Sequence, residues 1–201
     1  MTTAKDLFFL AMERQVNQPV GQGDLSLALA GAELIDLLGA GAVVLDGDRI
    51  VPEGDPQPDD RLLGEAAEHL VRQVPHERVE EWLWRRGGDL SGSYQDALEK
   101  DGQLAPRRGG LSPFGADRLE LVDSPSRSRA LSRWEAAEPV LVALASVVGI
   151  ESGQSEDEPN LDDEAVTTVL AVVNDAVMEL EAVRQRRTIE NSAFANLWRG
   201  P

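Results

Sequence analysis

The sequence contains no cysteine and only two histidines among its 201 residues. Without cysteine, disulfide scaffolds and thiolate metal sites are excluded, and the composition is compatible with a reducing cytosol. His69 and His76 do not have the His-x-x-x-His spacing of a helical zinc site. We therefore expect both histidines to be solvated surface residues, and we expect no metal site.

Basic residues are also scarce: 19 lysines and arginines are outnumbered by 36 aspartates and glutamates, which gives a formal net charge of −17. Such a protein is repelled by nucleic acid and by anionic bilayers unless its cations cluster on one face. The longest apolar run, Pro139–Val148, is half of the roughly 20 residues that span a bilayer. Leu7–Met12 is short and lacks the cleavage site of a signal peptide. The sequence predicts a soluble, cytoplasmic protein that does not bind nucleic acid.

Motifs of catalysis are missing as well. No Gly-x-Ser-x-Gly nucleophile elbow occurs, and the glycine-rich Gly87–Ser93 lacks the Lys-Ser or Lys-Thr pair of a P-loop. The carboxylate-dense stretch Asp46–Asp60 lacks the spacing and the bidentate glutamate of an EF-hand loop. A solvated acidic face is therefore favoured over a calcium site. We expect a protein without enzymatic activity and without a cofactor.

The sequence does contain a helix that is apolar on nearly every side, Leu25–Leu38, preceded by Asp24 as its predicted N-cap. Such a helix belongs inside a core. Glu33 and Asp36 lie one turn apart on it, and a buried carboxylate is costly unless it is paired. These carboxylates indicate either a polar pocket or a helix edge that reaches solvent, and the solvent edge is favoured.

A β-hairpin is predicted directly after this helix, over Val43–Val51. Two β-branched runs flank Asp46-Gly47, and both residues tolerate the positive φ of a type I′ turn. The remaining pattern is mainly helical, with a second short hairpin within Gln103–Asp123, and no linker divides residues 1–201 into domains. The further predicted helices are Ala4–Val16, Asp59–Val74, His76–Arg86, Leu90–Asp101, Pro125–Ala137 after a Ser124 cap, Val140–Val148 and Asp162–Arg187.

Arginine is the residue type that could form a functional patch on this acidic chain, because its planar fork matches phosphate. If the arginines converge they form a basic pocket, but dispersed surface charge that pairs with the many acids is the favoured interpretation for any one of them. Trp82 is expected in the core and Trp84 nearer the surface, since residues two apart do not share a helix face. The arginine groups are Arg85-Arg86, Arg107-Arg108, Arg127, Arg129 and Arg133, and Arg184, Arg186 and Arg187.

Several segments, in this order, together resemble the Golgi phosphoprotein 3 family, whose bacterial members are small proteins of about this length. They cover most of the chain. The segments are LFFLAMERQ, LAGAELIDLLGAGAVVL, EGDPQPDDRLL, VEEWLWRR, LEKDGQL and RWEAAEPVLVALASVVG.

The resemblance implies a single mainly helical domain that binds phosphatidylinositol 4-phosphate at membrane surfaces and acts as an adaptor. The family's headgroup-binding tryptophan and arginines fall near Gly21, Ala30, Gly88 and Ser91, so none is retained. Arg85 and Arg86, with Trp84, are the nearest substitutes and are the candidate lipid-headgroup residues. The family's hairpin has an oligomerisation role, which makes this a candidate self-association segment here: Val43, Val44, Leu45, Asp46, Gly47 and Ile50.

Two functions follow from these observations. The first is a cytoplasmic adaptor that visits membranes through a phosphoinositide or another anionic lipid. The second is a soluble protein-interaction module without lipid binding, which uses the hairpin and the acidic face to hold a basic protein partner. The family resemblance favours the first, and the net charge favours the second.

Overall fold

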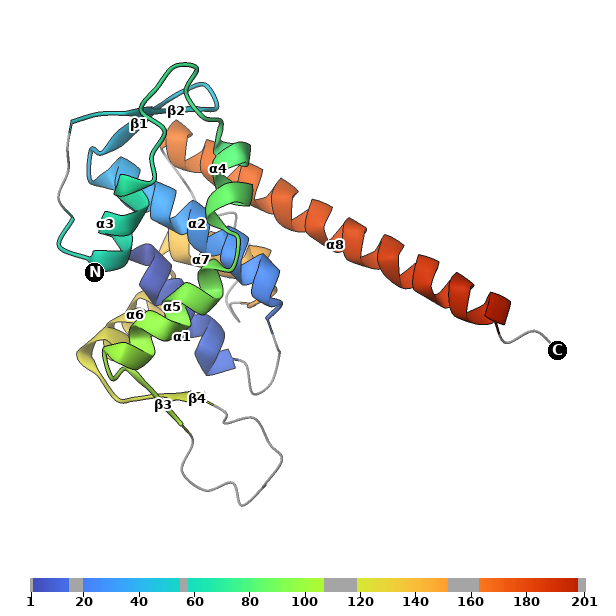
Figure 1. The fold of residues 1–201 in the computed structure, drawn as a ribbon. Helices are drawn as coiled ribbons and strands as arrows, with labels where there is room; N and C mark the ends of the chain where they lie inside the picture. The colour runs from blue at the N-terminus through green and yellow to red at the C-terminus, as the bar shows by residue number, and fades with distance from the viewer. Residues whose placement is uncertain (1, 15–19, 55–57, 107–118, 152–162, 199–201) are drawn as a thin grey trace.

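The computed structural model describes residues 2–14, 20–54, 58–106, 119–151 and 163–198. As predicted, the fold is mainly helical, with two short antiparallel hairpins (Figure 1). The elements are α1 (Thr3–Arg14), α2 (Gln22–Gly39), β1 (Val43–Asp46), β2 (Arg49–Pro52), α3 (Arg61–Glu68), α4 (Val79–Arg86), α5 (Leu90–Lys100), β3 (Leu104–Pro106), β4 (Leu119–Leu121), α6 (Pro125–Glu135), α7 (Pro139–Val147) and α8 (Glu164–Trp198).

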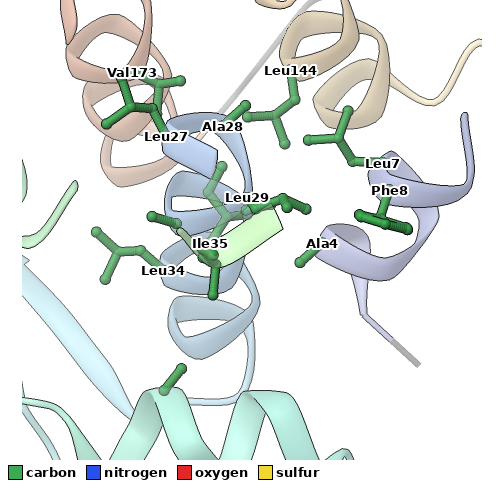
Figure 2. Close-up of a cluster of buried hydrophobic side chains, with 14 of the residues drawn as sticks. Ala4, Leu7, Phe8, Leu27, Ala28, Leu29, Leu34, Ile35, Leu144 and Val173 are labelled. Atoms are coloured by element: carbon green, nitrogen blue, oxygen red, sulfur yellow. The ribbon is translucent and has the colours of Figure 1, made fainter. Parts of the chain in front are cut away.

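Helix α2 is the centre of the molecule, as its apolar sequence predicts. Leu29 and Leu34 are fully buried, and α1, α7 and α8 pack around the helix with side chains such as Phe8, Leu144 and Val173 (Figure 2). The predicted N-cap is wrong, however, because α2 begins at Gln22 with Gly21 in the capping position. Asp24 lies inside the first turn instead. Both of its carboxylate oxygens accept hydrogen bonds from Arg184 Nη1 of α8, each at 2.7 Å.

The first hairpin forms as predicted, but its turn lies one residue further along the chain. Asp46 pairs with Arg49, so Gly47 and Asp48 are the two turn residues. Of these only Gly47 has a positive φ, 61°, which matches a type II′ turn with glycine in its first central position rather than type I′. The hairpin packs inward through Val43 and Ile50, while β2 is held at its outer edge by the segment before α4.

Helices α3 and α4 are shorter than predicted. Helix α3 ends at Glu68 rather than near Val74, and α4 begins at Val79 rather than at His76. The chain between them is mostly exposed, with Val74 at 79%, so extending either helix would bury little apolar surface. Pro75 also disfavours a helical conformation in the residue before it.

The second half of the fold contains the predicted second hairpin and the predicted helices after it. Strands β3 and β4 pair with Leu104 opposite Leu121 and Pro106 opposite Leu119. The residues between the two strands, including Arg107 and Arg108, lie outside the described ranges. Ser124 caps α6 by accepting from the Arg127 backbone N–H at 3.1 Å. Helix α7 starts at Pro139 but is buried on one face only, through Leu141, Leu144 and Ala145.

Helix α8 is longer than predicted and divides into two parts. Its first half packs along α2 through Val169, Val173 and Ala176. Gly31 of α2 allows this close approach, since a Cβ there would lie 2.3 Å from Val173 Cγ2. The second half extends away from the helical body (Figure 1).

Candidate functional site

Arg85, the first candidate headgroup residue, lies at the last turn of α4 and holds a carboxylate of the same chain. Its Nε and Nη2 donate to the two oxygens of Glu77, each at 2.7 Å, and Nη2 also donates to the His69 carbonyl at 3.0 Å. The guanidinium lies 5.3 Å from the ring centre of Trp82. The hydrogen bond with Glu77 raises the pKa of Arg85. An incoming phosphate would therefore have to displace a carboxylate that is already bound in a fork.

Arg86, the second candidate, points the other way and holds a buried acid. Its Nε and Nη2 donate to the two oxygens of Glu33 on α2 at 2.8 and 2.9 Å, and Tyr94 Oη donates to the same carboxylate at 3.2 Å. Glu33 is fully buried. Burial raises the pKa of Glu33, although the hydrogen bonds from Arg86 and Tyr94 oppose this. The favoured solvent-edge interpretation is wrong for Glu33, and the polar-pocket alternative is the one that the structure contains.

Asp36 has a different role from Glu33, although both carboxylates lie on α2. Its two oxygens accept the backbone N–H groups of Thr3 and Ala4 at 2.9 and 3.1 Å. These are free donors of the first turn of α1, so the Asp36 side chain caps α1 from a neighbouring helix. Burial raises the pKa of Asp36, and the two backbone hydrogen bonds oppose this.

Trp84, the third candidate, is 39% exposed, whereas Trp82 is fully buried and donates to the Ala30 carbonyl at 3.0 Å. This confirms the expected division between core and surface tryptophan. Trp84 therefore stands beside Arg85 on the outside of α4, but the two adjacent arginines are directed to different carboxylates, Glu77 and Glu33.

Two arginines of α6 also connect elements of the fold. Arg127 of α6 donates to Glu13 of α1 at 2.9 Å and contacts Asp123. Arg133 of α6 bridges Asp6 of α1 and Glu138. Together with Arg184, they show the dispersed pairing with acids that the sequence favoured over a single basic pocket.

The histidines have different environments. His69 is exposed, as expected, and its Nδ1 lies 2.7 Å from the Glu65 carbonyl. His76 is half-buried rather than fully solvated, and its backbone carbonyl accepts from Arg49 at 2.6 Å. Within the described ranges, no group of three or more histidine and acidic side chains is arranged to hold a metal ion.

An acidic cleft that the sequence did not reveal lies between the hairpin tip, α4 and α8. Its volume is about 250 Å³, and Arg78 in it pairs with Asp48 at 2.6 Å. Asp48 also lines a neighbouring, more open cleft of about 450 Å³ against the start of α8. No local sequence pattern indicates this site, because its residues come from three segments that are distant in the sequence. The acidic cleft is lined by Asp48, Arg78, Glu80, Val172, Asp175, Ala176 and Glu179.

The candidate oligomerisation segment is only partly available at the surface. Val43 and Ile50 are buried against the core, and Leu45 is half-buried. Val44, Asp46 and Gly47 are exposed, with Val44 at 40%. A partner of the hairpin would therefore meet the outer side of β1 and the turn.

A protein-family model spans the elements described above, from α1 into α8. The sequence model described as Golgi phosphoprotein 3 (GPP34) matches residues 4–189, which is nearly the whole chain. The chain belongs to the Golgi phosphoprotein 3 family. A comparison with curated proteins gives no match.

Two of the positions that align with the family's headgroup-binding side chains, Ala30 and Ser91, are buried in the structure. In this Golgi phosphoprotein 3 member, Ala30 is fully buried beneath Trp82. Ser91 is buried and bonded to Ser26 at 3.0 Å. These positions therefore serve packing between α2, α4 and α5.

In the described part of the chain, no helix combines the length and apolarity needed to cross a bilayer.

Proposed function

We propose that this Golgi phosphoprotein 3 family member is a non-catalytic adaptor that holds a basic protein partner in the acidic cleft. The observation that carries this proposal is the convergence of four carboxylates from β1–β2, α4 and α8 around one cleft. Arg78 neutralises Asp48 there. Glu80, Asp175 and Glu179 remain to attract lysine and arginine side chains, and the net charge of −17 adds long-range attraction.

A labelled peptide of four Arg-Ser repeats tests this proposal by fluorescence anisotropy at several salt concentrations. We expect binding that weakens with salt, and an affinity loss of about tenfold or more in the triple variant Glu80→Gln, Asp175→Asn, Glu179→Gln. The matched control is Asp96→Asn, Glu99→Gln, Asp101→Asn, which changes the net charge equally on and beside α5. Equal losses of affinity in both triple variants, or no peptide binding by the wild-type protein, would refute the proposal that the cleft binds a basic partner.

A second function, attachment to a membrane surface through an anionic headgroup, is favoured by the family membership. In this alternative the protein is cytoplasmic and peripheral, and phosphatidylinositol 4-phosphate is the ligand class. Arg85 and Trp84 are its candidate residues because both are partly exposed. Arg86 is a weaker candidate, since only 12% of its side chain is exposed and it is bound to Glu33.

Sedimentation with vesicles separates the two functions. Vesicles that contain phosphatidylinositol 4-phosphate are compared with phosphatidylcholine vesicles at low and high salt. Headgroup binding predicts co-sedimentation with the first vesicles only, and a decrease in Arg85→Gln and Trp84→Ala. The absence of co-sedimentation at either salt concentration would retire the membrane function and leave the protein-interaction function in place.

A further inference from the structure

Among the described residues that line the acidic cleft, Arg78 is the one basic side chain, and its contact there is incomplete. Its Nε donates to Asp48 Oδ2 at 2.6 Å, while neither of its Nη nitrogens has a hydrogen-bond acceptor in the described part of the chain. The two side chains are 48% and 42% exposed, so water screens their attraction. Arg86, by contrast, holds the fully buried Glu33 with two nitrogens. Arg78 is therefore an occupant of the cleft that another cation can replace.

The backbone at Arg78 is fixed, so its replacement at Asp48 needs only a side-chain movement. The N–H of Arg78 donates to Glu81 Oε2 at 2.9 Å, and its carbonyl accepts from the Trp82 N–H at 3.0 Å. The next residue, Val79, donates its N–H to the Asp48 carbonyl at 2.9 Å, which joins α4 to the hairpin turn. The cleft at the meeting point of the hairpin, α4 and α8 can thus exchange its occupant without a change of fold (Figure 1).

The α8 side of the cleft offers what a long basic side chain requires. Asp175 and Glu179 lie one helical turn apart, and Val172 and Ala176 lie on the same face of the helix. The apolar pair can contact the methylene groups of such a side chain while its charged end meets the carboxylates. Within the described ranges, neither these two carboxylates nor Glu80 of α4 forms an ion pair. Their charges are therefore available to a ligand.

We propose that Arg78 is an intrachain competitor of the basic partner, and that an arginine of the partner displaces it from Asp48. An incoming arginine can bind both oxygens of Asp48 in a planar fork, whereas Arg78 binds one. A lysine cannot form this fork, so the exchange selects arginine over lysine. This inference rests on the proposed function, because it specifies the partner and the regulation of the same cleft.

Fluorescence anisotropy with two labelled peptides, four Arg-Ser repeats and four Lys-Ser repeats, tests the competition. The wild-type protein should bind the arginine peptide more tightly. Arg78→Gln should raise the affinity for the arginine peptide about threefold. The gain for the lysine peptide should be larger, because Asp48 then becomes accessible without displacement of a competitor. The preference for arginine should therefore decrease in this variant.

Arg61→Gln is the matched control, because Arg61 also pairs with a carboxylate at 2.6 Å, is 56% exposed and does not line the cleft. It removes the same charge and should change either affinity by less. Circular dichroism checks that both variants keep their helix content.

The outcomes separate this inference from the proposed function. Equal effects of Arg78→Gln and Arg61→Gln, or a wild-type protein without a preference for arginine, would refute the competition. So would an unchanged preference in Arg78→Gln. In each of these cases the proposed function stands if the triple variant of the cleft carboxylates still loses affinity for the arginine peptide. Absence of binding by both the wild-type protein and Arg78→Gln would refute the two proposals together.

Discussion

Arg86 encloses the fully buried carboxylate of Glu33 in a two-pronged hydrogen bond, at 2.8 and 2.9 Å, and so joins α4 to the central helix. Tyr94 of α5 completes the arrangement from a third element. A residue chosen from the sequence as a candidate lipid ligand thus compensates a charge inside the core. Its role is explained by the cost of leaving a buried carboxylate without a partner.

The first prediction concerns this pair. Arg86→Ala leaves Glu33 buried and unpaired, and we expect it to lower the free energy of unfolding by about 3–5 kcal/mol. Arg85→Ala is the matched control on the same turn, with an expected loss of about 1 kcal/mol, because 40% of its side chain is in solvent. Urea denaturation measures both values. Equal losses would mean that the Glu33 pair has no special role.

The second prediction concerns pH. Burial raises the pKa of Glu33 above its ordinary value of 4.5, so the folded state holds its proton at a pH where the unfolded state has released it. The stabilisation from this group is complete below pH 4.5 and is lost as pH rises through the folded-state pKa. Denaturation of the wild-type protein and Glu33→Gln should therefore show a stability difference that shifts in favour of the wild type as pH falls toward 4.5. A shift in the opposite direction would contradict the raised pKa.

The third prediction concerns the cap that α2 supplies to α1. Asp36→Ala removes the acceptors of the Thr3 and Ala4 backbone N–H groups, and we expect a loss of about 1–2 kcal/mol in unfolding free energy. Asp36→Asn keeps one side-chain oxygen and should cost less. Amide hydrogen exchange should accelerate first at Thr3 and Ala4, and unchanged exchange there would contradict the capping role.

The fourth prediction concerns the contact between α2 and α8. Gly31→Ala places a methyl group 2.3 Å from Val173 Cγ2, and we expect a loss of about 1–3 kcal/mol from overpacking. Adding Val173→Ala should recover part of that loss in a double-mutant cycle. Gly64→Ala is the control, because its methyl group meets nothing within 4 Å and should stabilise α3 by about 0.5–1 kcal/mol. A cycle without coupling would show that the two helices adjust independently.

Local sequence signals predicted those parts of the fold that depend on near neighbours. The buried apolar run of α2, the existence of the first hairpin, the Ser124 cap and a separate helix over the apolar segment after Pro139 all occur as expected, although the hairpin turn lies one residue further along. The incorrect predictions concern residues whose contacts are made with segments that are distant in the sequence. Asp24 looked like an N-cap, but it is bound by Arg184, which lies 160 residues away in the sequence.

The sequence by itself determined that this chain builds a mainly helical, acidic protein around one buried helix, because burial pattern and turn chemistry are local properties. Only the tertiary structure decided what the charged residues do. The partners of Glu33, Arg85 and Arg86 are determined by tertiary packing that brings together positions 8 to 61 residues apart. Desolvation then makes a partner for the fully buried Glu33 necessary, and no local pattern encodes that requirement.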